Sequence, residues 1–140
     1  MYTYNYPRAA LTVDAIVFAK KGSNVSVLLI KRGREPFKNK WALPGGFIEM
    51  DETLETACKR ELLEETGLKV EKMTQFKTYD AIDRDPRHRT ISVVYFTELS
   101  EIKQVKGGDD ASGAEWFSVA ELPELAFDHK QILEEFFAFL

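Results

Sequence analysis

Residues 46–68 read Gly46-Phe47-Ile48-Glu49-Met50-Asp51-Glu52-Thr53-Leu54-Glu55-Thr56-Ala57-Cys58-Lys59-Arg60-Glu61-Leu62-Leu63-Glu64-Glu65-Thr66-Gly67-Leu68. Asp51 is the expected N-cap of a helix, because a short acidic side chain can accept a hydrogen bond from a free backbone N–H. Gly67 favours a left-handed stop at the other end. The stretch therefore predicts a helix over about residues 52–66, which the chain enters through the glycine pair Gly45-Gly46.

The predicted helix carries acidic side chains within its apolar face. At about 100° per residue, that face is expected to hold Leu54, Ala57, Cys58 and Leu62. Glu61 and Glu65 interleave with these positions, and Glu64 lies at their edge. Carboxylates this close repel one another and are costly to desolvate unless a positive charge lies between them. A divalent cation with a preference for oxygen ligands, such as Mg²⁺, would supply that charge.

An alternative interpretation needs no metal. The glutamates could form a solvated face, with Arg60 pairing Glu64 across one helical turn. Two features favour the metal site instead: the acidic positions fall inside the apolar arc, and the glycine pair before the helix permits close approach of a ligand to the backbone.

The remainder of the chain predicts an α+β fold in which strands and helices do not alternate regularly. A closing helix is expected after Asp128, with Gln131 completing a capping box. The expected strands are short runs rich in β-branched and aromatic residues, at Leu11–Phe18, Val25–Ile30, Phe76–Tyr79, Thr90–Phe96 and Glu115–Phe117.

Length and composition exclude several classes of protein. A chain of 140 residues with 44% hydrophobic composition suits one domain, expected to span residues 1–140. The formal net charge of −4 argues against a nucleic-acid partner, and no apolar run is long enough to span a membrane. Cys58 is the only cysteine, so an intrachain disulfide is excluded, and we expect a cytoplasmic protein.

The stretch 46–68 resembles the Nudix box of the Nudix hydrolase family, with every defining position filled. The order of the expected elements is also similar, so the resemblance covers nearly the whole chain. It implies an α/β/α sandwich around a mixed β-sheet. It also implies hydrolysis of a nucleoside diphosphate linked to another moiety, with Mg²⁺ as the cofactor and Mn²⁺ as a substitute.

The resemblance also implies roles for residues at matching positions. Glu61 and Glu65 would bind the metal directly, Glu64 would be a further ligand, and the carbonyl of Gly45 would complete the set. Glu61 and Glu64 are thereby candidate catalytic residues. Glu52 and Arg60 would form a supporting ion pair that orients the box, as partners of metal ligands commonly do.

A general base outside the box is expected from the loop after Gly107-Gly108, where Asp109 and Asp110 precede a strand marked by Trp116. Asp110 is the preferred candidate. Glu64 is the alternative base, and an ordinary aspartate turn is the interpretation without a catalytic role.

The substrate is expected to be a small nucleotide bound by basic side chains. Arginine forks suit phosphate oxygens, and the loop at residues 83–89 holds Arg84, Arg87 and Arg89. Arg32, in the basic stretch that follows the second strand, and His129, beside the closing helix, are further candidates.

Three segments, residues 6–14, 83–89 and 125–129, are similar to bacterial ADP-ribose pyrophosphatases and to the Nudix portion of repressors of NAD metabolism. Such repressors carry a DNA-binding domain after the Nudix part. The chain ends at Leu140, so we expect the enzyme, which would split ADP-ribose into AMP and ribose 5-phosphate. The alternatives are a hydrolase of oxidised nucleoside triphosphates and a non-catalytic sensor of ADP-ribose. The sequence leaves the oligomeric state open, with a homodimer as one alternative.

We predict that Asp110→Asn lowers kcat by about 100-fold or more, the usual contribution of a general base. Steady-state hydrolysis measured beside Glu64→Gln checks the assignment. Near-normal turnover in Asp110→Asn, with loss of turnover in Glu64→Gln, would transfer the role to Glu64.

Overall fold

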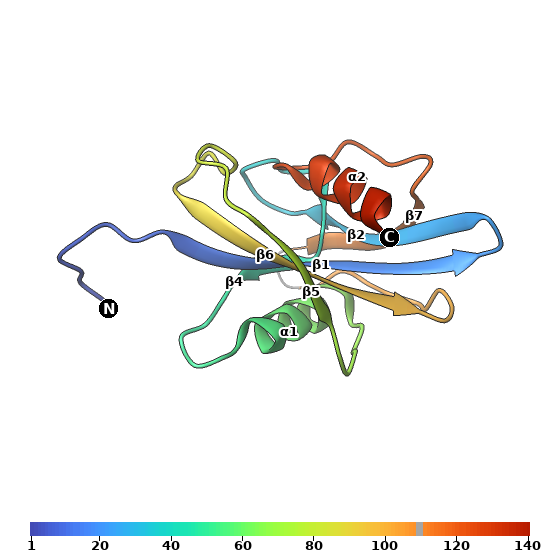
Figure 1. Cartoon of the computed structure of the whole chain (residues 1–140), viewed down its shortest axis with the longest axis horizontal. Coiled ribbons are helices and arrows are strands. Elements are labelled where there is room, and N and C mark those ends of the chain that lie inside the picture. The colour runs from blue at the N-terminus through green and yellow to red at the C-terminus, as the bar shows by residue number, and fades with distance from the viewer. Residues whose placement is uncertain (109–110) are drawn as a thin grey trace.

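Two helices lie on opposite faces of a mixed sheet (Figure 1). The computed structural model describes residues 1–108 and 111–140. No helix in these ranges is long and apolar enough to cross a membrane. The elements are β1 (Ala10–Lys21), β2 (Asn24–Arg32), β3 (Trp41–Ala42), β4 (Gly45–Phe47), α1 (Leu54–Thr66), β5 (Thr74–Tyr79), β6 (Thr90–Leu99), β7 (Ala111–Ser118) and α2 (His129–Phe139).

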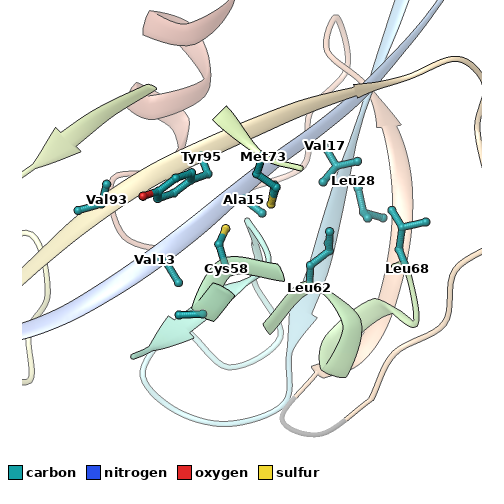
Figure 2. Close-up of a cluster of buried hydrophobic side chains, with 11 residues drawn as sticks. Val13, Ala15, Val17, Leu28, Cys58, Leu62, Leu68, Met73, Val93 and Tyr95 are labelled. Atoms are coloured by element: carbon teal, nitrogen blue, oxygen red, sulfur yellow. The ribbon is translucent and has the colours of Figure 1, made fainter. Parts of the chain in front are cut away.

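β1 is the central strand, and both of its faces are covered by protein. Val13, Ala15 and Val17 belong to the hydrophobic cluster that includes Cys58 and Leu62 of α1, as Figure 2 shows. The alternate residues Ile16 and Phe18 belong to a second cluster with Ile132, Leu133 and Phe136 of α2. Burial on both faces explains why β1 is an almost continuous apolar run. The predicted α/β/α sandwich is confirmed.

The strand pairings open a gap between β1 and β2. The two strands pair only near their shared turn, from Phe18↔Val27 to Lys21↔Asn24. Farther from the turn, β4 pairs with β1 at residues 12–14, and β3 pairs with β2 at residues 30–31. β7 occupies the other edge of β2, and β6 runs parallel to β1 on its other edge. The segment from β3 to β4 therefore fills the place where β1 and β2 separate.

The boundaries of α1 agree with the sequence pattern at one end only. Gly67 caps the C-terminus with φ of 76°, and its N–H donates to the carbonyl of Leu63, as predicted. The N-cap is Thr53 rather than Asp51, so that prediction was wrong. Its Oγ1 accepts from the N–H of Thr56 at 3.2 Å, and the helix begins two residues later than expected, at Leu54.

The predicted capping box of α2 is also wrong. Asp128 occupies the N-cap position, but its side chain makes no capping hydrogen bond. Its carboxylate accepts instead from Arg84, at 2.6 and 2.9 Å, and Gln131 donates to Glu135. A charged partner distant in sequence therefore outcompetes the local cap.

Leu62→Ala should lower the free energy of unfolding by about 2–5 kcal/mol, because the Leu62 side chain is fully buried between α1 and the sheet. Leu63→Ala, at a 46% exposed position on the same helix, is the matched control and should change it by less than about 1 kcal/mol. Chemical denaturation followed by circular dichroism measures both. Equal losses in the two variants would contradict the assignment of the buried face.

Candidate active site

A cavity of about 350 Å³ lies where β1 and β2 separate. Its walls come from both strands, the β3–β4 segment, α1, the loop before β6 and the start of α2. The predicted site residues that line it are Arg32, Gly45, Glu61, Glu65, Arg84, Arg87 and His129. Glu64 and Arg89 lie outside the lining, and Asp110 lies outside the described residues.

Glu65 is the most buried carboxylate of α1, with 7% of its surface exposed. Its Oε1 accepts from the N–H of Gly45 at 2.8 Å. Burial, together with the negative charges of Glu61 and Asp14, raises the pKa of Glu65 to about 8, although the Gly45 hydrogen bond acts in the opposite direction. The site thus holds several carboxylates in a region where negative charge is poorly solvated.

Both glycines before α1 permit close approach, and Gly45 is required by it. A Cβ on Gly45 would collide with the backbone carbonyl of Val13 on the paired strand. A Cβ on Gly46 would lie 2.7 Å from Oε2 of Glu61, so the missing side chain leaves room for that carboxylate. The glycine pair therefore lets the backbone and the acidic face of α1 come together.

Arg60 gathers three glutamates around one guanidinium. Its Nη2 donates to Glu52 at 2.7 Å, and its Nη1 donates to Glu61 at 2.8 Å and to Glu64 at 3.0 Å. The predicted pair with Glu52 and the alternative i,i+4 pair with Glu64 are both present. Arg60 thus holds Glu61 at the cavity and binds Glu64, which lies outside the lining, on the next turn of α1.

The carboxylate oxygens of α1 suit a hard divalent cation, although their side chains do not converge on a common metal position in this structure. Within residues 1–108 and 111–140, no three His, Cys, Asp or Glu side chains are grouped closely enough to hold a metal ion. Glu61 faces Arg60, and Glu65 faces the N–H of Gly45. Both nevertheless line the cavity from adjacent turns of α1 and offer carboxylate oxygens, the ligand that such cations prefer.

His129 is held by the protein on both sides of its ring. It is 4% exposed, and its Nδ1 accepts from the N–H of Leu43 at 3.0 Å. The proton therefore lies on Nε2, which is 3.6 Å from Oδ1 of Asp14. Burial lowers the pKa of His129, so the ring is neutral near pH 7. Its ring nitrogens already face protein groups, an arrangement that favours a structural role over the predicted contact with substrate.

The arginines of the loop before β6 differ in their surroundings. Arg84 is buried and makes a two-point ion pair with Asp128. Arg87 donates through Nε and Nη2 to Asp85, at 3.1 and 2.8 Å. Arg89 donates to the carbonyl of Ala81 at 3.4 Å. Arg84 and Arg87 therefore line the cavity, but each is already paired with an aspartate of the protein. Arg89 lies outside the lining.

Arg32 brings positive charge to the wall of the cavity. Its Nε donates to the carbonyl of Pro36 at 2.7 Å. Burial, followed by repulsion from Arg87, lowers the pKa of Arg32, while the negative charge of Glu65 acts in the opposite direction. The cavity thus places a guanidinium within electrostatic reach of the buried carboxylate of α1.

Asp14 is one of the lining residues that the sequence prediction missed. It is 7% exposed, it accepts from the hydroxyl of Ser92, and it lies beside His129. The available signal was an acidic residue inside the apolar run of the first strand. Phe47 also lines the cavity, and nothing in the pattern of its strand distinguishes it from a core residue.

This arrangement of a glycine pair, a carboxylate-bearing helix and a mixed sheet matches a known family. The model of the NUDIX domain matches residues 8–137. The chain belongs to the Nudix family. The predictions of a Nudix fold and of a Nudix hydrolase are therefore confirmed. Nudix hydrolases generally use divalent metal ions, in agreement with the donor set of α1.

Relatives of this Nudix hydrolase include both an enzyme and a regulator. This chain is 43% identical over 131 residues to the ADP-ribose pyrophosphatase of Methanocaldococcus jannaschii, and the match covers 94% of the chain and 75% of the relative. It is 34% identical to the ADPR responsive transcriptional repressor NtrR of Acinetobacter baylyi, covering 96% of the chain but only 55% of the repressor. The chain thus spans about half the length of that regulator.

A solved structure of the family has a very similar fold. The NUDIX domain of Shewanella oneidensis NrtR, complexed with ADP ribose, superposes on this Nudix hydrolase with a TM-score of 0.88. The two are 33% identical, and the match covers 95% of this chain and 89% of the other.

His129→Leu should lower the free energy of unfolding by about 1–3 kcal/mol, because it leaves the buried N–H of Leu43 without its acceptor. Thermal and chemical denaturation measure the loss. A variant of unchanged stability with a raised KM would instead make His129 a substrate ligand.

Proposed function

We propose that this Nudix hydrolase splits the pyrophosphate bond of ADP-ribose in the presence of Mg²⁺, releasing AMP and ribose 5-phosphate. The observation that carries the proposal is one cavity lined both by the carboxylates of Glu61 and Glu65 of α1 and by the guanidinium group of Arg32 of β2. A pyrophosphate is an anion that can bind a cation held by Glu61 and Glu65 while an arginine balances its remaining charge. The ADP-ribose pyrophosphatase of M. jannaschii and the domain complexed with ADP ribose support the choice of substrate.

The residues of the chain have separate tasks in this proposal. Glu61 and Glu65, with the carbonyl of Gly45, would hold Mg²⁺, and Arg60 would keep Glu61 oriented toward the cavity. Bound Mg²⁺ neutralises phosphate oxygens and lowers the pKa of a coordinated water. Arg32, which lines the same cavity, would balance the charge of the pyrophosphate. Asp110 and Glu64 stay the candidates for the general base.

A second candidate is a domain that binds ADP-ribose without hydrolysing it. The similarity to an ADPR responsive repressor favours this alternative. The intact carboxylate set of α1 favours the enzyme, because a sensor needs no metal-activated water. A single domain at residues 1–140, a homodimer, the lack of a nucleic-acid partner and a cytoplasmic location stay predictions.

Purified protein with Mg²⁺ should release AMP from ADP-ribose faster than it hydrolyses NADH, dinucleoside polyphosphates or 8-oxo-dGTP. Chromatography of the products measures each rate. Removal of the cation with EDTA should stop hydrolysis, and added Mg²⁺ should restore it. Rapid hydrolysis of 8-oxo-dGTP without release of AMP from ADP-ribose would overturn the choice of substrate, and binding of ADP-ribose without turnover would favour the sensor.

Glu61→Gln and Glu65→Gln should each lower kcat for ADP-ribose by about 100-fold or more, because the bound metal supplies several kcal/mol of charge stabilisation. Mg²⁺ titrations of each variant should show weakened activation. Glu134→Gln, the same change at an exposed position of α2, is the matched control and should behave as the unmodified protein. Full activity in Glu65→Gln would remove that residue from the metal site.

A further inference from the structure

The segment at residues 103–108 packs along the last turn of α1. The backbone N–H of Lys106 donates to the carbonyl of Thr66 at 3.1 Å. The last four carbonyls of a helix have no partner within the helix, so this bond satisfies one of them from outside. Gly108 lies against another carbonyl of the same turn, since a Cβ at this position would be 2.5 Å from the carbonyl oxygen of Glu64. The segment therefore contacts the backbone of the turn that carries the acidic side chains.

Two consecutive glycines let this segment fit between α1 and β7. A Cβ on Gly107 would lie 2.8 Å from the backbone N and Cα of Gly113 in β7, whereas one on Gly108 would meet α1. Neither glycine has a left-handed φ, so close packing rather than backbone conformation explains the missing side chains. The pair permits a separation between strand and helix that a side chain would prevent.

Trp116 of β7 holds the other end of the segment. Its indole Nε1 donates to the carbonyl of Lys103 at 2.8 Å. The Trp116 ring and the side chain of Val105 also pack against the hydrophobic cluster that includes Leu62 of α1. The segment is thus hydrogen-bonded to both α1 and β7, and it is in apolar contact with the core between them.

Burial of the segment does not account for these contacts, because all of its residues except Val105 and Gly108 are exposed. The turn that it contacts carries Glu65, which is 7% exposed and accepts from the N–H of Gly45. A displacement of this turn would move the Glu65 carboxylate, and a misplacement of about 1 Å can lower the rate of an enzyme by about 100-fold. The contacts therefore bear on the position of the acidic turn.

We propose that Gly108 and Trp116 are positioning residues for the carboxylates of α1. Through the segment 103–108 they fix the last turn of the helix against β7, so that Glu64 and Glu65 keep the positions from which they can bind a divalent cation. Neither Gly108 nor Trp116 lines the cavity, so each acts through the helix and does not touch the substrate. This inference rests on the proposed function, because it assigns both residues to the metal site of α1.

Binding of Mn²⁺ to the purified protein, measured by electron paramagnetic resonance without substrate, tests the assignment. Gly108→Ala should weaken Mn²⁺ binding by about 10- to 100-fold, the usual effect of losing a group that orients metal ligands. Its kcat for ADP-ribose should fall by a similar factor and its KM should stay nearly unchanged, because the added methyl group lies outside the cavity lining. Trp116→Phe keeps a ring and removes the N–H donor, so it should cause a smaller loss in the same direction.

Gly113→Ala is the matched control. It adds the same methyl group on β7, where the nearest atom would be Cβ of Lys31 at 4.0 Å, an ordinary contact distance. This variant should bind Mn²⁺ and turn over ADP-ribose as the unmodified protein does. If Gly108→Ala fails to fold, as judged by circular dichroism, Trp116→Phe decides the question, because it introduces no larger group.

Unchanged Mn²⁺ binding and kcat in the folded variants would overturn the positioning role. Equal losses in Gly113→Ala would also overturn it, because any methyl group added in this region would then have the same effect. An unmodified protein that binds no Mn²⁺ would overturn the proposed metal site and this inference with it. Weakened Mn²⁺ binding in Gly108→Ala would support the positioning role even if ADP-ribose proved not to be hydrolysed.

Discussion

The hydrogen bond from the N–H of Gly45 to the carboxylate of Glu65 joins the two halves of the site. It fixes the end of α1 against the segment that fills the gap between β1 and β2. Only glycine fits there, because a side chain at residue 45 would meet the backbone of β1. The cavity, the acidic wall and the approach of Arg32 to Glu65 all depend on this contact between helix and turn.

The sequence predicted what local patterns determine. Periodicity and turn residues predicted the apolar arc of α1, its C-terminal glycine and the strands against which both helices pack. The structure has all three features. Glu61 and Glu65 were identifiable because they interrupt an apolar face, and both line the cavity. The two short strands β3 and β4 were missed, since two or three residues carry no periodic signal.

The rest of the site depends on partners that are distant in the chain. Asp128 resembles a helix cap, but it binds Arg84, 44 residues away. His129 resembles a ligand for phosphate, but its partners are Leu43 and Asp14. A run of arginines indicates an anion site, whereas the folded chain supplies carboxylates to two of them. The pairings of Asp128 and of His129 form only when β1, the β3–β4 segment, the loop before β6 and α2 meet, so no local pattern contains them. Arg87, by contrast, pairs with Asp85 within its own loop.

Arg60 also affects the stability of the acidic cluster in the metal-free protein. Its guanidinium touches Glu52, Glu61 and Glu64 together, so it serves as an internal counter-ion for the acidic helix. If Glu61 bound a metal, Arg60 would still keep Glu52 and Glu64 as anionic partners, so its charge would not be left unpaired. Small zinc domains, by contrast, fold only with their metal. Because Arg60 already neutralises part of this acidic cluster, we expect the chain to fold without metal.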